Sequence, residues 1–539
     1  MTPLAGLLDV LLRGISLIAF ATAVGGVAYV LWALRPFQEW TVPLAGFVRR
    51  ALRLITGAAF TLAGAQVLVL FVLHPWTLAD ETGRWPLAAL LHTDYARTGL
   101  ITIALALCLG ALGRTLMPRP RSATLWTGAV ALVLALLVNS AWLAHGVSRL
   151  MHREVLMAVT VLHVAGAAVW IGGLIHLAAF WPLQRREADA GGYGPVVLAR
   201  FSGLAIASVA VLVLPGLYLA WVYVGDLDAL IGTGYGVMVL TKVVLLLATL
   251  TLGAINLLLV KSWRRSWPDP VPARRIPALV EAEVGLGVTI LLAAASLTSL
   301  PPSIDIGADR ASPAEVMARF VPKLPRLASP PVQDLLASAG RIDDTLAERQ
   351  PAEYAWSEFN HHMAGIFVFA MGLCALMERR GAARWARHWP LIFLGLAAFL
   401  FIRNDPRAWP LGPAGFWESM ALPDVLQHRL AVGVVVALAL FEWQVRTGRL
   451  QNPRWRLVFP LLCAAGGALI LTHSHAMFNL KSEFLAEVSH APLGVFAVLM
   501  GWGRWLELRL PEEDRRIPAW VWPVAFTLIG LTLLLYREI

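Results

Sequence analysis

Apolar residues run along this chain in long blocks that are separated by short polar or basic segments. A helix needs roughly 20 residues to cross a hydrocarbon layer of about 30 Å, and most of these blocks reach that length. The pattern predicts an all-α fold, a polytopic transmembrane helical bundle of about fourteen helices. The predicted spans are residues 8–34, 52–74, 95–113, 123–146, 154–182, 198–224, 235–260, 277–299, 361–378, 388–402, 427–445, 457–474, 486–506 and 518–536.

Arginine and lysine fall in every second loop between these spans, which predicts that those loops face the cytoplasm. Both termini and the remaining loops are then expected outside. Residues 301–357, rich in Pro, Asp and Ala, become an external connector between an eight-helix domain, 1–300, and a six-helix domain, 358–539. The basic loops cover residues 35–53, 114–121, 185–200, 261–275, 379–387, 446–456 and 504–516.

The composition supports a membrane protein and excludes several other classes. Hydrophobic residues make up 58% of the chain and charged residues 14%, whereas about a quarter of a soluble chain is charged. The net charge of +10 comes from the basic loops, so it predicts no nucleic-acid partner. The three cysteines stand alone in apolar runs, which excludes a disulfide framework. Without a Walker A sequence or a soluble ATPase domain, neither a primary pump nor an enzyme is expected.

Most of the histidines gather at the predicted outer ends of the helices. Three short stretches, "LMHREVLM", "FNHHMAG" and "THSHAMF", also place methionine beside histidine. Imidazole suits copper, zinc and iron, and thioether favours Cu(I), so this mixture predicts copper, as Cu+ or Cu2+. For any single histidine, a satisfied interfacial or core role is the alternative. The candidate ligands in these stretches are Met151, His152, His361, His362, Met363, His473, His475 and Met477.

Four of the C-terminal helices begin or end with histidine on the same predicted side. Convergence of His362, His428, His475 and His490 would form a metal site in a bundle core. Adjacent positions on a helix are about 100° apart, so only one of His361 and His362 can face such a site, and we favour His362. Paired histidines on facing helices also hold b-type haem, which leaves a redox membrane protein as the alternative function.

The fifth predicted span carries a recognisable pattern, "LHVAGAAVWIGGLIHLAAFWP", with His163 and Trp170 on one face. This segment resembles the "LHxxxxxxWxGGL" helix of the copper resistance D family. The resemblance continues over about residues 150–302 through "RFSGLAIASVAVLVLPGLYLAW", "GTGYGVMVLTKVVLLLATLTLGAIN" and "LVEAEVGLGVTILLAAASLTSLPP". The His-rich C-terminal part looks like an extension found on long members of the family.

The resemblance implies a multi-pass protein of the bacterial inner membrane with periplasmic termini. It implies movement of copper ions inward, with a periplasmic copper-binding protein of the CopC type as partner. His163 is then a step on the path from the outer metal sites.

Four further residues are candidates for the path: Trp170, Lys242, Asn256 and Glu283. Lys242 is an intramembrane charge, which is costly and by default functional, although it could instead snorkel to the interface. Glu283 is expected near the cytoplasmic start of its helix, either as an exit site with Glu281 and His176 or as a charge among the headgroups. Asn256 is expected to bond across helices, and Trp170 is otherwise a packing residue.

Overall fold

The computed structural model is helical throughout its described ranges, which contain no strand. The chain divides into two compact units. Unit 1 contains Met1–Arg310, and unit 2 contains Ala311–Ile470 and Leu480–Ile539. The division predicted from the sequence, with a separate connector at residues 301–357, stays a prediction. The structure describes residues 3–37, 39–143, 149, 151–184, 193–266, 271–339, 350–403, 405–472 and 481–538.

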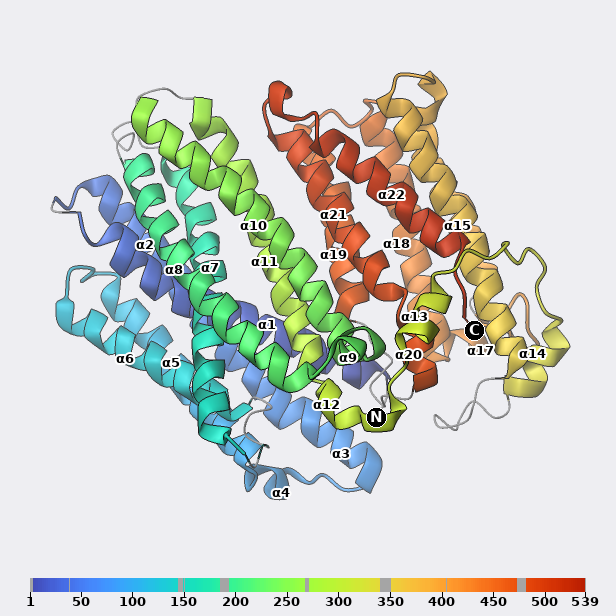
Figure 1. Cartoon of the computed structure of the whole chain (residues 1–539), viewed down its shortest axis with the longest axis horizontal. Helices are drawn as coiled ribbons and strands as arrows, with labels where there is room; N and C mark the ends of the chain where they lie inside the picture. The colour runs from blue at the N-terminus through green and yellow to red at the C-terminus, as the bar shows by residue number, and fades with distance from the viewer. Residues whose placement is uncertain are drawn as a thin grey trace. The chain divides into compact units, whose positions relative to one another are not determined.

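In the described part of unit 1 there are eight long helices, and their apolar lengths follow the blocks in the sequence (Figure 1). Short helices at their ends are α3 (His74–Thr82), α4 (Leu87–Leu91), α9 (Leu227–Gly232) and α12 (Ser303–Ile306). The long helices are α1 (Pro3–Tyr29), α2 (Val42–Leu68), α5 (Asp94–Leu116), α6 (Ala123–Ser140), α7 (Arg153–Gln184), α8 (Tyr193–Val224), α10 (Gly234–Ser266) and α11 (Val271–Leu297).

Helix α1 packs against α2, α7 and α11 in unit 1. Its contact with α7 is a backbone contact between small residues. A Cβ atom on Gly172 would lie 1.8 Å from the carbonyl oxygen of Ala21, and one on Gly25 would lie 2.4 Å from that of Ala168. Small residues permit this close approach, which in a membrane supplies the van der Waals contact that holds helices together. Helices α7 with α8, and α10 with α11, form the other extensive pairs.

Six long helices form unit 2, where α22 packs along both α15 and α21. The shorter elements of this unit include α13 (Pro313–Arg319), α14 (Val332–Ala339), α17 (Phe416–Met420) and α20 (Lys481–Glu487). Trp389 is 1% exposed at the core, where Arg446 stacks on its ring. The long helices are α15 (Pro351–Arg379), α16 (Ile392–Arg403), α18 (Pro423–Arg446), α19 (Val458–Thr472), α21 (His490–Arg509) and α22 (Pro518–Leu534).

Thirteen helices in the described ranges are long and apolar enough to cross a membrane. The fourteenth predicted span corresponds to α22, an apolar helix of 17 residues. The short tenth span is Arg384–Arg403, in which a 3-10 segment containing Pro390 precedes α16. The prediction of an all-α polytopic bundle is therefore confirmed. The side of the membrane on which the termini lie, and the inner membrane itself, stay predictions.

Candidate functional site

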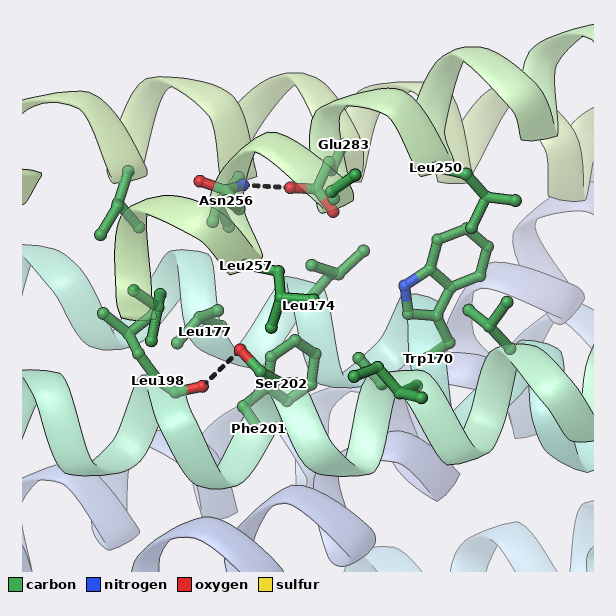
Figure 2. Close-up of a pocket in the computed structure, with 18 residues that line it drawn as sticks. Trp170, Leu174, Leu177, Leu198, Phe201, Ser202, Leu250, Asn256, Leu257 and Glu283 are labelled. Carbon is green, nitrogen blue, oxygen red and sulfur yellow. Dashed lines mark hydrogen bonds between the residues drawn. The ribbon is translucent and has the colours of Figure 1, made fainter. Parts of the chain in front are cut away.

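A cavity of about 250 Å³ lies between helices α7, α8, α10 and α11 of unit 1. Its wall is mostly aliphatic and aromatic, as Figure 2 shows. Polar atoms reach it from Trp170 on α7, Ser202 on α8, Asn256 on α10 and Glu283 on α11. An apolar pocket with a few convergent polar groups is the usual form of a small-ligand site. Three of the four predicted path residues on these helices therefore meet in one place.

Glu283 is the acidic residue of this cavity and is only 3% exposed. The Asn256 side-chain nitrogen donates a hydrogen bond to Glu283 Oε1. Asn256 Oδ1 is buried without a hydrogen-bond partner. A Cβ atom on Gly253, one turn before Asn256, would lie 3.3 Å from Glu283 Oε2, so glycine leaves the carboxylate room against α10. The expected bond of Asn256 across helices is confirmed, and its partner is the buried carboxylate.

The depth of Glu283 corrects one sequence-based expectation. Helix α11 begins at Val271, so Glu283 lies about three turns inside the helix, away from its first turn. The interpretation of Glu283 as a charge among the headgroups is wrong for this structure. Glu281 and His176, the other residues of the expected exit site, do not line the cavity. The His176 ring stacks on Tyr29, and its Nε2 donates to the carbonyl oxygen of Thr22 on α1.

Trp170 and Ser202 are further residues with polar atoms in the lining of the cavity. Trp170 is 3% exposed, and Figure 2 shows its indole nitrogen on the side of the ring that faces the labelled pocket residues. The Ser202 hydroxyl donates to the carbonyl oxygen of Leu198, 2.9 Å away, so its lone pairs remain as acceptors. The cavity thus offers an indole donor, a hydroxyl oxygen and a carboxylate within an apolar wall.

His163 lies on α7 about two turns before Trp170, on the same face of the helix. Its Nδ1 donates to the carbonyl oxygen of Leu212 on α8 at 2.8 Å, so in the neutral ring Nε2 carries the lone pair. Pro215 lies within α8 beside this contact. A Cβ atom on Gly216 would lie 2.8 Å from His163 Cε1, so glycine makes space for the ring.

Lys242 on α10 is close enough to His163 for an electrostatic interaction between the two side chains. It is partly buried and lies about two turns inside the helix. The structure therefore groups the predicted path residues at two levels of unit 1. His163 and Lys242 occupy one level, and the cavity with Glu283 occupies the other.

The predicted ligands before α7 lie on the surface of unit 1. Met151 is 76% exposed, and His152 is also exposed and has a positive φ of 56°. The carbonyl oxygen of His152 accepts the backbone N–H of Leu156, which starts the helix. These two side chains are accessible, and they do not converge with His163.

In unit 2, His362 is completely buried and both of its ring nitrogens contact backbone groups. Its Nδ1 accepts the N–H of Arg326 at 2.7 Å, and its Nε2 donates to the carbonyl oxygen of Tyr536 at 2.7 Å. Through these two hydrogen bonds, His362 on α15 links the backbone at Arg326 to the backbone at Tyr536. The expectation that His362, and not His361, faces the other histidines is wrong, because the two hydrogen bonds turn it away.

His361 is the residue that lies beside another histidine. Its ring centroid is 6.1 Å from that of His490, and its ring stacks on Tyr536 at 3.9 Å. His428 is exposed, and Met363 is partly buried. The predicted ligands His473, His475 and Met477 lie outside the described residues. Within the described ranges, no group of three or more His, Cys, Asp or Glu side chains is arranged to hold a metal ion.

Sequence reasoning missed Gly253 and Tyr536. Gly253 carries no chemistry of its own, and only its position opposite Glu283 gives it a role. Tyr536 is the final residue of the last predicted span, where an aromatic residue indicates a membrane interface. Its contact with His361 spans most of unit 2 in sequence, so no local pattern could indicate it.

Comparisons with known proteins point to the same helices. Residues 195–297, which include most of α8 and all of α10 and α11, match the family model described as Copper resistance protein D. The chain is 29% identical over 266 residues to the Copper transport protein CutJ of Bacillus subtilis (strain 168). This match covers 47% of the chain and 46% of the relative, so the chain spans about half the length of the curated relative it matches. No solved structure matches the chain.

The membrane-length helices and the mostly apolar internal cavity define a polytopic helical membrane protein with an internal site. The matched segment supplies three of the four helices around that cavity, including Asn256 and Glu283. Through residues 195–297 of unit 1, the chain is similar to the copper resistance D family. The six-helix His-rich part as an extension of that family stays a prediction.

Proposed function

We propose that this protein binds copper ions and moves them inward across the bacterial inner membrane through unit 1. The observation that carries the proposal is Glu283, a carboxylate buried in the helix interior at a cavity within the family-matched segment. A charge inside a membrane is costly and marks an ion or proton pathway. The choice of copper follows the family description and the name of the relative.

The proposed path has two steps inside unit 1. His163 receives the ion at Nε2, because its Nδ1 is held by the carbonyl oxygen of Leu212. While Lys242 is protonated, its positive charge repels a cation at His163 Nε2, so binding of the ion at this first step is weak. The ion then passes Trp170, two turns further along α7, to the carboxylate of Glu283, where Asn256 holds Oε1 and leaves Oε2 beside Gly253.

A gradient is sufficient to drive this movement. One positive charge that moves inward across 100 mV gains about 2.3 kcal/mol. That energy corresponds to roughly fifty-fold accumulation. The surface pair Met151 and His152 is accessible to a donor, and a periplasmic copper-binding protein of the CopC type is the proposed partner there.

The test is copper accumulation by cells that lack other copper importers. Glu283→Gln keeps an acceptor for Asn256 and removes the charge, so we expect accumulation to fall at least tenfold while the protein stays in the membrane. Gly203→Ala on α8 is the matched control, because a Cβ atom there meets nothing within 4 Å. Equal accumulation in wild type and Glu283→Gln, measured by elemental mass spectrometry, contradicts the proposed role.

A further inference from the structure

A hydrogen bond joins two basic parts of unit 2 near the end of α18. Trp443 lies on α18, and His388 lies in the 3-10 segment Arg384–Leu391 that precedes α16. The indole nitrogen of Trp443 donates to His388 Nδ1 at 2.9 Å. The basic loop that follows α15 is thereby tied to the helix that leads into the next basic loop, residues 446–456.

This hydrogen bond determines which nitrogen of His388 carries a proton. An indole nitrogen only donates, so His388 Nδ1 is the acceptor. In the neutral imidazole, Nε2 then carries the hydrogen and is itself a donor. His388 therefore presents an N–H group to whatever lies beside Nε2.

A second donor lies beside that nitrogen. Arg387 Nε, which always carries a hydrogen, is 3.5 Å from His388 Nε2. Two N–H groups cannot bond to each other, and 3.5 Å is beyond the usual length of a hydrogen bond. An oxygen atom about 2.9 Å from each nitrogen would accept from both. The two groups therefore form a site for an acceptor, and beside a guanidinium the strongest acceptor is an anion.

Arg449 adds a second positive charge on the same indole. Its guanidinium carbon lies 4.3 Å from the centroid of the Trp443 ring. The chain reverses direction before it, because Gly448 has a φ of 76° and the backbone N–H of Arg449 returns to the carbonyl oxygen of Gln444 at 2.9 Å. A glycine in this conformation commonly ends a helix. The side chains of Arg387 and Arg449 are both exposed, so an external ligand can reach them.

Buried carboxylates at this end of α18 are engaged by another arginine. Arg446 pairs with Glu378 at 2.7 Å and with Glu442 at 2.8 Å. In the described part of the chain, these two ion pairs do not include Arg387 or Arg449. The charges of these two arginines therefore remain to attract an anion from outside the protein.

Exposed tryptophans indicate that this end of unit 2 lies at a membrane surface. Trp385, in the same segment as Arg387 and His388, is 62% exposed, and Trp455 in the next basic loop is 44% exposed. Tryptophan is enriched at the headgroup level of a bilayer. Anionic lipids carry their phosphate at that level, where basic side chains are attracted to them.

We propose that Arg387, His388 and Arg449 bind the phosphate of an anionic phospholipid headgroup near the end of α18. One phosphate oxygen accepts from the N–H groups at Arg387 Nε and His388 Nε2, and the guanidinium of Arg449 supplies the second positive charge. The lipid links the loop after α15 to the loop after α18. Binding changes no covalent bond, and the site is independent of copper and of the cavity around Glu283.

The experiment measures lipid binding to the full chain, purified in a neutral detergent, by native mass spectrometry. Phosphatidylglycerol is the probe, and wild type should bind it about tenfold more tightly than zwitterionic phosphatidylcholine. Arg387→Gln and Arg449→Gln should each lower the affinity for phosphatidylglycerol about fivefold or more, because each removes a charge that faces the phosphate. Arg516→Gln is the matched control, because it removes an exposed arginine from another basic loop, and it should retain the wild-type affinity.

Two substitutions test His388 itself. His388→Gln offers an amide oxygen to Trp443 and an amide N–H to the phosphate, so it should keep most of the affinity. His388→Leu offers neither group and should lower the affinity about fivefold. Equal affinities of wild type and His388→Leu would overturn the role of His388.

Three further outcomes would overturn the lipid site. Unchanged affinity in both Arg387→Gln and Arg449→Gln, with monodisperse elution, removes its ligands. An equal loss in Arg516→Gln shows that the lipid responds to total charge and not to a site. Displacement of phosphatidylglycerol by the same concentration of inorganic phosphate shows that the occupant is a soluble anion. Loss of affinity in the two site variants, with retention in Arg516→Gln, supports the proposal.

Discussion

Asn256 on α10 donates a hydrogen bond to Glu283 on α11, so a buried carboxylate is paired with a neutral amide and with no cation. Glu283 shows no ion pair in the described part of the chain, although it is almost fully buried. A carboxylate in this position favours either a proton or an incoming cation. This relationship between two residues is the basis of the proposed transport function.

The pair can be tested through stability. Asn256→Leu removes the donor and leaves the carboxylate buried without it, so the free energy of unfolding should fall by about 1–3 kcal/mol. The double variant Asn256→Leu with Glu283→Leu should recover most of that loss, because replacing both partners with apolar groups is nearly neutral. Thermal unfolding in detergent measures both effects. Equal stability of wild type and Asn256→Leu would show that the hydrogen bond carries no energy.

The position of His163 depends on Gly216. A Cβ atom there would lie 2.8 Å from His163 Cε1, so Gly216→Val should displace the ring and lower copper accumulation as strongly as His163→Ala. Gly203→Val on the same helix is the control, because its Cβ atom meets nothing within 4 Å. If His163→Ala abolishes accumulation and Gly216→Val does not, the contact with Gly216 is not needed for the role of His163.

The crossing of α1 and α7 should be the most sensitive contact of unit 1 to side-chain size. A Cβ atom on Gly172 would lie 1.8 Å from the backbone oxygen of Ala21, which no side-chain movement relieves. We expect Gly172→Ala to lower the free energy of unfolding by about 3 kcal/mol, the upper end for overpacking. Gly57→Ala on α2, where the new Cβ atom meets nothing within 4 Å, should be neutral or stabilising. Similar stabilities in detergent would refute a backbone contact at this crossing.

An ion pair of Glu315, which lies outside the candidate membrane spans, predicts a pH dependence in unit 2. Lys481, the first residue of α20, contacts Glu315 at 2.7 Å. Together with Ser312 it lowers the pKa of Glu315 from 4.5 to about 2. Because the folded pKa lies below the ordinary value, the stabilising contribution is complete above pH 4.5 and is lost only as the pH falls through about 2.

Hydrogen exchange in α20 measures this contact. Wild type should be more protected than Glu315→Gln over Lys481–Glu487, and the difference should be the same at about pH 6 and about pH 5. The comparison with the variant at each pH removes the intrinsic pH dependence of exchange. Equal protection of wild type and Glu315→Gln at both pH values would show that the contact leaves the pKa of Glu315 at its ordinary value.

Much of the fold followed from the sequence for a simple reason. Membrane lipid offers no hydrogen-bond partner to the backbone, so an apolar block of some 20 residues has few structures available to it other than a helix. The span predicted at 154–182 is α7, Arg153–Gln184. The error at α11 had a local cause, because Pro277 made residue 277 resemble a helix start, whereas the helix continues back to Val271.

The candidate site required the tertiary structure. Neighbouring helices decide which face of each helix points inward, and contact with lipid does not decide it. The sequence by itself determined that His163, Trp170, Asn256 and Glu283 lie on membrane helices, and that histidines collect at helix ends. It could not determine that His361 faces His490. His361 and His362 are adjacent, so their side chains point about 100° apart around α15. The backbone contacts of His362 with Arg326 and Tyr536 select between them, and these partners are distant in sequence.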